Sequence, residues 1–391
     1  MSWDMVRLGD VCDIINGSTP KTENESYWGG DIIWVTPTDL GRLTDKVIFD
    51  SGRHITSAGY NSANTNMIPL NSIVLSTRAP IGHIAINSVE LCTNQGCKGI
   101  VPNDSIHVGF LYFYLLFSKD VLEALGSGAT FKELSTTALR TFAIPLPPLG
   151  EQQRIAIEIE RLFAVVEKAK QAAVEQLATA QALNAAYLRE VFEGNDRDIL
   201  SIEEICSHIT DGAHHTPSYR PHGVPFLSVK DITKGKISFD ECRYISQEEH
   251  LLLTKRCKPE IGNILYTKVG TTGIAKEIDI TDDFCIFVSI ALLKLKEDVL
   301  PKFVEYSLNS EFTKKQADNL TQGAANRNLV IKDLKKITLK CPSYNEQFRI
   351  VEYLNLHNHK TQKTIAAIQA QLDTINAMPA AILRQAFSGQ M

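Results

Sequence analysis

The sequence PLPPLGEQQRI, residues 145–155, opens a stretch that the chain carries twice, at 147–194 and again at 342–389. The two copies align without a gap at a constant offset of 195 residues. Identical residues recur at Glu151/Glu346, Gln152/Gln347, Arg154/Arg349, Ile155/Ile350, Leu177/Leu372, Leu188/Leu383, Arg189/Arg384, Phe192/Phe387 and Gly194/Gly389. Each copy opens on proline, continues through residues that favour helices, and ends on glycine. Each therefore predicts one long α-helix.

Apolar or small residues in the first copy step alternately by four and three, which is the 3.5-residue repeat of a coiled-coil seam. They are Ile155, Ile159, Leu162, Val166, Ala169, Ala173, Ala180, Leu183 and Tyr187, with Gln176 as an interruption. The seam of the second copy moves to Ile365, Ile368, Leu372, Ile375 and Ile382. Pro379 lies within it and predicts a kink, because proline removes a backbone donor. We expect the helices to pair antiparallel about a pseudo-twofold axis. Two ordinary bundle helices are the alternative.

Length and composition indicate a soluble protein with two domains. The chain has 391 residues, of which 44% are hydrophobic and 22% charged. It shows neither an apolar run of membrane-spanning length nor a basic and apolar signal peptide at its start, so we expect a cytoplasmic protein that does not enter membranes. Its eight cysteines include no C-x-x-C pair, which argues against a zinc site or disulfide framework.

The remaining segments predict an α+β fold with two β-rich domains, each followed by a long helix. We divide the chain into a first domain at 1–145, a helix at 146–195, a second domain at 196–340 and a helix at 341–391. Expected strands are 32–35, 72–76, 83–86, 224–229, 263–266 and 284–295, and expected helices are 110–125 and 303–320. Gly17 and Gly212 keep the 195-residue offset, whereas the segments between such anchors match weakly. This pattern is typical of two binding modules with different targets on one frame.

Catalytic motifs are missing from the sequence. It contains no phosphate-binding loop, glycine-rich dinucleotide turn, H-E-x-x-H or G-x-S-x-G motif. His214 and His215 are adjacent and lack a Cys or carboxylate at useful spacing, so we expect no metal site. Asp39 and Asp231 follow similar strands. They could be paired catalytic carboxylates, but capping of a turn is the favoured interpretation.

The block at 145–155, its echo at 342–350, and the opening Leu8-Gly9-Asp10 with Asn16-Gly17-Ser18-Thr19-Pro20 resemble the specificity subunit of type I restriction-modification systems. The resemblance covers the whole chain. It implies two target-recognition domains that each read half of an asymmetric, bipartite DNA sequence, held apart by the paired helices. The second block departs from the pattern at Cys341, Ser343 and Tyr344, so the two helix starts need not dock a partner equally well.

The same resemblance implies that the chain is not an enzyme. Methylation and cleavage would belong to two modification (methyltransferase) subunits and to restriction (translocase and nuclease) subunits. S-adenosylmethionine, ATP and Mg would bind in those partners, and this chain would need no cofactor. Two other interpretations remain open: a specificity subunit of a related system whose partner fuses nuclease and methyltransferase, and a coiled-coil scaffold that binds protein without DNA.

Candidate DNA-binding residues are polar side chains on loops, which can reach base edges while cations fix the register on phosphates. In the first domain they are Ser18, Thr19, Lys21, Thr36, Thr38, Arg78, His83 and Lys132. In the second domain they are His214, His215, Tyr219, Arg220, Lys230, Lys268, Thr271, Thr272, Gln322, Asn326, Arg327 and Asn328. Because the net charge is -5, binding to DNA phosphates would depend on local clusters of cations. Candidate partner-binding residues are Glu151, Gln152, Arg154, Glu346, Gln347 and Arg349, although they could instead only brace the helix starts.

Overall fold

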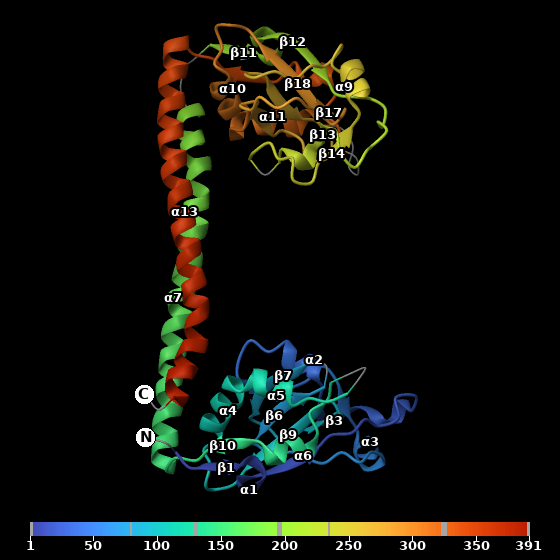
Figure 1. The fold of residues 1–391 in the computed structure, drawn as a ribbon, viewed down its shortest axis with the longest axis vertical. Coiled ribbons are helices and arrows are strands. Elements are labelled where there is room, and N and C mark those ends of the chain that lie inside the picture. Colours follow the sequence, from blue (N-terminus) through green and yellow to red (C-terminus); the bar gives the residue numbers. More distant parts are fainter. Residues whose placement is uncertain are drawn as a thin grey trace. The chain divides into compact units, whose positions relative to one another are not determined.

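A computed structural model describes residues 3–78, 80–128, 132–193, 198–233, 235–321 and 327–388. The chain forms two compact units. The first contains Met1–Ala173 and Gln371–Met391, and the second contains Val174–Ala370. Each unit holds one β-rich domain together with a part of both long helices, α7 (Leu149–Phe192) and α13 (Tyr344–Phe387) (Figure 1). We call the β-rich part of each unit the first and the second domain.

The first domain is built on a five-stranded sheet in the order β2-β9-β6-β7-β4. A three-stranded sheet, β5-β3-β8, and a two-stranded sheet, β1-β10, complete it. Its strands are Met5–Arg7 (β1), Cys12–Asn16 (β2), Trp28–Val35 (β3), Val47–Ile48 (β4), His54–Ile55 (β5), Ile73–Thr77 (β6), Ile81–Asn87 (β7), Cys92–Thr93 (β8), Cys97–Pro102 (β9) and Ala143–Pro145 (β10). Its helices are Leu8–Val11 (α1), Glu25–Tyr27 (η1), Pro37–Gly41 (α2), Ser57–Ser62 (α3), Val108–Phe117 (α4), Lys119–Ala124 (α5) and Thr136–Thr141 (α6).

The second domain has a four-stranded sheet in the order β12-β18-β15-β16, with a three-stranded sheet β14-β13-β17 and a two-stranded sheet β11-β19. Its strands are Ile199–Ser201 (β11), Cys206–Asp211 (β12), Val224–Leu227 (β13), Arg243–Ile245 (β14), Ile264–Thr267 (β15), Ala275–Glu277 (β16), Cys285–Ile286 (β17), Ile290–Leu295 (β18) and Thr338–Lys340 (β19). Its helices are Ile202–Ile205 (α8), Val229–Asp231 (η2), Gln247–Leu253 (α9), Pro301–Leu308 (α10), Glu311–Leu320 (α11) and Ile331–Leu334 (α12).

The two domains share one topology. The strand order β2-β9-β6-β7 corresponds to β12-β18-β15-β16, and β5-β3-β8 corresponds to β14-β13-β17. The parallel pair of β3 with β8 also corresponds to the parallel pair of β13 with β17. Among the described residues, the parallel pair of β4 with β7 has no counterpart in the second domain. The predicted α+β architecture of two β-rich domains, each followed by a long helix, is therefore confirmed.

Three expected elements are divided in the structure. The expected strand 284–295 forms β17 and β18, which belong to different sheets. The expected helices 110–125 and 303–320 are each interrupted by a break, at Ser118 and at Asn309–Ser310. Ser310 provides the N-cap of α11. A continuous apolar pattern hides these breaks, because periodicity does not reveal a change of sheet or a capped restart.

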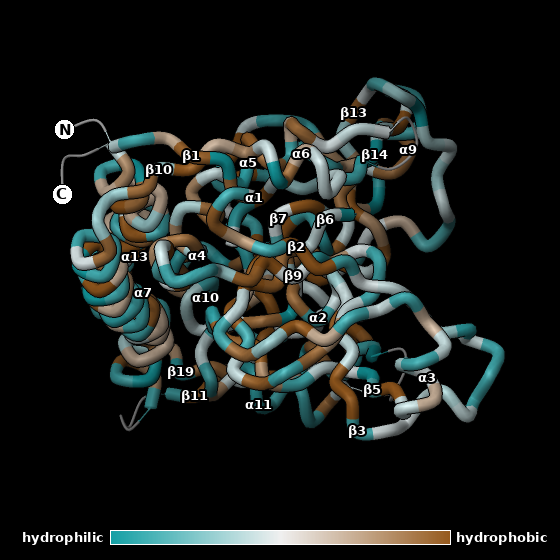
Figure 2. The backbone as a smooth tube through the Cα atoms, turned by 90° about the horizontal axis from the view of Figure 1, so that it is seen from below, coloured by the Kyte–Doolittle hydropathy of each residue, from teal (hydrophilic) through white to brown (hydrophobic). Residues whose placement is uncertain are grey.

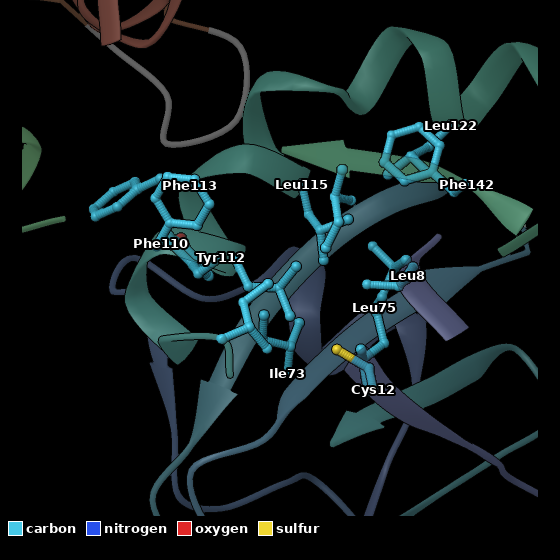
Figure 3. Packing of buried hydrophobic residues seen from close by; sticks show 14 of the residues in the cluster. Leu8, Cys12, Ile73, Leu75, Phe110, Tyr112, Phe113, Leu115, Leu122 and Phe142 are labelled. Atoms are coloured by element: carbon cyan, nitrogen blue, oxygen red, sulfur yellow. The ribbon is translucent and has the colours of Figure 1, made fainter. Parts of the chain in front are cut away.

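The core of the first domain packs the apolar side chains of α4 on the large sheet. Figure 3 shows Phe110, Tyr112 and Phe113 of α4 against Ile73 and Leu75 of β6. The end of α13 joins this cluster, where Leu383 and Ala386 pack with Ile155 and Ile159 at the start of α7. In the second unit Ile350 and Leu354 of α13 pack in the same cluster as Phe192 of α7. In each unit the two helices therefore meet in opposite directions.

The predicted seam of α13 is confirmed, because Ile365, Ile368, Leu372, Ile375 and Ile382 are all buried or half-buried. The predicted seam of α7 is confirmed at Ala173, Ala180 and Tyr187, which are buried or half-buried, and is wrong at Ala169 and Leu183, which are exposed. Leu183 is 36% exposed, and the inward positions are Ala173, Leu177, Ala180 and Asn184. This register keeps the alternation of four and three without interruption, so Gln176 lies outside the seam. Figure 2 shows the resulting mixture of hydrophilic and hydrophobic residues along α7.

One polar contact lies within this seam. Asn184 donates through Nδ2 to Oδ1 of Asn358 at 3.1 Å. An apolar residue was expected here because the sequence offers Leu183 next to it. Within the described residues, no helix is long and apolar enough to cross a membrane.

Candidate nucleic-acid interface

The turns after β3 and β13 are built in the same way. The Asp39 carboxylate accepts from the backbone N of Thr36 at 2.8 Å and from its hydroxyl at 2.6 Å. The Asp231 carboxylate accepts from the N and hydroxyl of Ser228 at 2.7 and 2.9 Å. Both turns are capping boxes. The interpretation of Asp39 and Asp231 as turn caps is therefore confirmed.

A glycine lies in the loop between β2 and β3 and in the equivalent loop between β12 and β13. A Cβ on Gly17 would lie 2.2 Å from the carbonyl oxygen of Asn94, and a Cβ on Gly212 would lie 2.0 Å from that of Ile286. Only glycine allows so close a backbone approach. The offset of 195 residues between these two glycines thus has a structural cause.

The loops that follow β2 and β8 meet at one edge of the first domain. The Ser18 N donates to the Thr93 carbonyl at 2.9 Å, and the hydroxyl of Thr19 bonds to Gln95. Lys21 and Thr38 are exposed near the two ends of β3. The loop that holds Gln95 continues to Gly96, whose carbonyl accepts from the N of Thr77 at the end of β6.

Arg78 and Lys132 extend this edge. The Arg78 guanidinium pairs with Glu133 at 2.8 Å, and Lys132 is exposed beside it. Below them the buried Lys98 ammonium donates to Asn16 Oδ1 at 2.8 Å. Burial lowers the pKa of Lys98 from its usual value, because desolvation disfavours the charged ammonium.

Asp211 organises the corresponding edge of the second domain. Its side chain is only 9% exposed and contacts His214 at 2.9 Å, Lys268 at 3.2 Å and Arg256 at 3.3 Å. Burial alone would raise the pKa of Asp211. The hydrogen bonds from His214 and Lys268 outweigh burial and lower this pKa below its usual value. Asp211 therefore holds two cations and a histidine at the end of β12.

Arg327, Asn328 and the threonines lie next to this group. The Arg327 carbonyl accepts from Gly270 N at 2.9 Å, and its guanidinium pairs with Asp318. Asn328 bridges to Val269, and Thr272 contacts Thr321 through their hydroxyls at 3.4 Å. Thr271 is exposed. Gln322 and Asn326 lie outside the described residues.

The small sheet of the second domain carries the remaining candidates. His215 and Tyr219 are exposed by 69% and 37%, and Arg220 bridges to Tyr244. The Lys230 ammonium donates to the Glu241 carbonyl at 2.7 Å. Within the described residues, no group of three or more His, Cys, Asp or Glu side chains could hold a metal ion, and His214 and His215 bond to different carboxylates.

Two predicted DNA-binding residues lie apart from these loop surfaces. His83 lines a cavity of about 690 Å³ together with α7 residues such as Glu160 and Phe163. Lys268 is 6% exposed and bonds to Asp211 inside the domain. We therefore leave both outside the DNA surface proposed below. Sequence reasoning missed Asn16, Asp211 and Lys98. Asn16 and Asp211 could have been found, because each immediately precedes an anchoring glycine at the same offset.

The starts of the long helices are held by buried glutamines. Gln152 accepts from His107 N at 2.7 Å and donates to the Pro147 carbonyl at 2.8 Å. Gln347 repeats this with Leu300 N at 2.9 Å and the Pro342 carbonyl at 3.0 Å. Both side chains are buried, so they brace the helix starts.

The charged neighbours of these glutamines are more accessible. Arg154 forms two hydrogen bonds of 2.8 Å with Glu151, and its side chain is 50% exposed. In the second copy, Glu346 is half-buried and Arg349 is exposed.

Comparison with known proteins places these features in context. The family profile for the type I restriction modification DNA specificity domain matches residues 1–176 and 198–385. The MjaIX specificity subunit of Methanocaldococcus jannaschii is 37% identical over 171 residues, which cover 43% of this chain and 39% of that protein. The EcoBI specificity subunit of Escherichia coli is 26% identical over 77% of this chain and 69% of its own length.

Two solved structures share the fold along the whole chain. One comes from work on complex assembly and conformational transition of a type I R-M system. It has a TM-score of 0.78 at 22% identity and covers 100% of this chain and 98% of that chain. The HsdS subunit of Thermoanaerobacter tengcongensis has a TM-score of 0.67 at 21% identity, with coverage of 100% and 97%.

Proposed function

Because this chain belongs to the family of type I restriction modification DNA specificity domains, we propose that it directs a restriction-modification complex to its DNA target. The chain itself performs no catalysis. Each of its two domains reads one half of an asymmetric, bipartite target in double-stranded DNA.

The observation that supports this proposal is that the two domains share a strand order but present different side chains on their loops. The sheets of the two domains have the same order, yet the edge of the first domain is built on Asn16 and that of the second on Asp211. A shared frame presents both loop sets in the same way, and different side chains select different bases. The two half-sites should therefore differ.

Cations at these edges supply the sequence-independent part of binding. Lys21, Arg78 and Lys132 of the first domain and Arg220 and Lys230 of the second are exposed. Lysine and arginine neutralise phosphates and release counterions, so the affinity for DNA falls as the salt concentration rises. Because the chain carries a net charge of -5, this attraction to phosphates depends on the local clusters of cations.

The long helices fix the gap between the two half-sites. Each contains 44 residues and rises about 1.5 Å per residue, or about 66 Å in all. Reading heads on one face of a duplex are best spaced near a helical turn, on the order of 10 base pairs. The target should therefore contain several unspecified base pairs between two specified halves.

The helix starts dock the partners, which we take to be two modification subunits. The surface that remains available comprises Glu151, Arg154, Glu346 and Arg349, because Gln152 and Gln347 are buried. Charge reversal of all four residues should weaken assembly with a modification subunit in light scattering. Charge reversal of Glu158 and Arg161 is the matched control, because this pair has the same spacing in the sequence and a nitrogen–oxygen distance of 2.7 Å. Undiminished assembly of the quadruple variant would contradict docking at this surface.

Restriction subunits would join the same complex in the cytoplasm. The partner subunits would bind S-adenosylmethionine, ATP and Mg, which places the chemistry outside this chain.

Methylation-site sequencing of a host with and without this gene, together with its modification subunit, tests the proposed function. We expect one new methylated motif with two unlike halves and a gap. Binding of the purified complex to that duplex should weaken steeply with salt. An unchanged set of methylated sites in cells that contain the assembled complex would contradict the proposal.

A further inference from the structure

In the first domain an exposed arginine lies over the ring of a tryptophan. The Arg53 guanidinium carbon is 3.7 Å from the centroid of the Trp28 ring and 5.5 Å from that of Trp34. The two tryptophan rings meet edge to face at 5.0 Å. Trp34 is 3% exposed and its indole N donates to the Ser18 carbonyl at 3.0 Å. The arginine therefore rests on a rigid support that is fastened to the candidate loop at Ser18.

The second domain repeats the arrangement with other residues. The Arg243 guanidinium carbon is 4.3 Å from the centroid of the Tyr219 ring. Tyr219 in turn meets the buried Phe226 at 6.0 Å. Arg243 and Tyr219 line a cavity of about 420 Å³ together with Ser228 and Lys230. In the second domain, too, an arginine stacked on an aromatic ring borders a cavity that candidate DNA-binding residues line.

The two arginines occupy equivalent positions in the fold. Arg243 is paired with Phe226 across β14 and β13, and the Arg53 carbonyl accepts from the N of Trp34 on β3. Trp34 and Phe226 each stand two residues before a capping box, at Thr36 and Ser228. The supporting rings differ in origin, because Trp28 lies on β3 and Tyr219 lies in the loop before β13. The same stacked geometry is therefore reached through different aromatic residues.

A short sequence match confirms this equivalence. Arg53-His54-Ile55-Thr56 corresponds to Arg243-Tyr244-Ile245-Ser246. In each case the last residue is the N-cap of the next helix, since Thr56 accepts from Gly59 N and Ser246 accepts from Glu249 N. The offset between these segments is 190 residues.

The stacked arginines differ from three other arginines at these edges. Arg78, Arg256 and Arg327 each pair with a carboxylate. Within the described part of the chain, neither Arg53 nor Arg243 has a carboxylate partner. Stacking restrains the guanidinium plane and leaves the N–H groups at its edge able to donate. Such a fork matches two acceptors side by side, as guanine presents them at O6 and N7 in the major groove.

We propose that Arg53 and Arg243 are specificity-determining residues, and that each donates its restrained guanidinium fork to one guanine of its own half-site. This inference rests on the proposed function and names two residues that carry it out. The aromatic support reduces the conformational freedom that each arginine loses on binding. A phosphate contact would use the same fork but would select no base.

Substitution in the assembled methyltransferase complex tests the proposal. The variants are Arg53→Ala, Arg53→Lys, Arg243→Ala and Arg243→Lys, and Arg7→Ala removes an exposed arginine from β1 as a control. The readouts are the methylated motif in cells and competition binding between duplexes that differ at one base pair. We expect each variant of Arg53 to lose about 5- to 100-fold of discrimination at one guanine of one half. Arg243 variants should do so in the other half, while the control keeps the full motif.

The lysine variants separate recognition from charge. Lys keeps the positive charge but lacks the planar fork, so Arg53→Lys should retain affinity and lose base preference. Uniform weakening on all sequences, or an intact preference in the lysine and alanine variants, would overturn the proposal. Absence of any gene-dependent motif for the unsubstituted complex would instead count against the proposed function.

Discussion

The corresponding edges of the two domains each hold a buried lysine, but the first domain uses a neutral side chain and the second uses a charged one. At the end of β2 the first domain places a neutral amide, Asn16, which accepts from Lys98 and from Thr136 at 2.8 Å each. At the end of β12 the second domain places a carboxylate, Asp211, which gathers Lys268, His214 and Arg256. Both positions hold a buried lysine, but Lys98 comes from β9 and Lys268 follows β15. The common frame thus holds a buried lysine at this edge in both domains, but the lysine comes from a different place in the sheet and pairs with a different side chain.

This difference predicts that Asp211 is the more demanding position. Asp211→Ala leaves Lys268 buried without its counter-charge, and removal of one partner of a buried pair costs about 3 to 5 kcal/mol. Asn16→Ala deletes a hydrogen bond of the buried Lys98 ammonium but removes no counter-charge, and we expect a cost of about 1 to 3 kcal/mol. Urea denaturation of the full chain measures both. The double variant Asp211→Ala/Lys268→Met should recover part of the loss. Equal costs for Asp211→Ala and Asn16→Ala would show that charge does not distinguish the edges.

Gly17 and Gly212, by contrast, should behave alike in the two domains. Alanine at either position would force its Cβ against a carbonyl oxygen at 2.2 or 2.0 Å, which requires a backbone shift. We expect each substitution to cost about 1 to 3 kcal/mol in the free energy of unfolding. Gly150→Ala is the control, because no atom lies within 4 Å of its Cβ and helix propensity favours alanine. A tolerated Gly212→Ala would contradict the common anchor.

The helix seam gives a smaller contrast. In the second unit the seam contains Asn184 bonded to Asn358, whereas in the first unit Ala173 and Ile375 are buried and apolar. An asparagine in a seam specifies the register and lowers stability. Asn184→Ala should cost about 1 kcal/mol, because Asn358 loses its partner. Replacement of both asparagines by Leu should raise the midpoint of thermal unfolding. A lower midpoint for the double variant would show that the pair stabilises the seam.

Acid should lower the stability of the edge at Asp211 in the second domain more than that of the edge at Asn16 in the first. The pKa of Asp211 is lowered in the folded state, so its ionised form contributes stability that is present above the usual value of 3.8. That contribution is lost as the pH falls below 3.8 toward the lowered pKa, whereas Asn16 does not titrate. The difference in stability between the natural chain and Asp211→Asn, measured by denaturation from pH 6 downward, should shrink in this window. A difference in stability that stays constant as the pH falls would contradict the predicted titration of Asp211.

Local patterns predicted much of this fold. Prolines and glycines marked the long helices, the heptad stepping located the seam of α13, and Asp39 and Asp231 were recognised as caps. These features depend on residues close together in the chain. Ser18 and Thr19 contact the loop that holds Thr93 and Gln95, because strand order brings distant loops together, which no local pattern shows.

Other features depended on contacts between distant residues. Asp211 meets Arg256 and Lys268 only in the folded sheet, so its role was missed. Arg53 and Arg243 were missed for another reason. Their offset of 190 residues departs from the constant 195, because the loops that precede them differ in length. Leu183 was assigned to the seam instead of Asn184, since hydrophobicity was preferred over an unbroken register.

We propose that each domain reads one half of the target independently on a common frame. A chain in which residues 203–337 are replaced by a copy of 8–142 tests it most directly, because both reading heads then carry the same loops. The variant is expressed with the modification subunit, and the complex is purified before the methylated sites of the host are sequenced. We expect a palindromic motif, in which the original first half is repeated on the opposite strand in place of the second half. An assembled complex that still methylates the original asymmetric motif would contradict it.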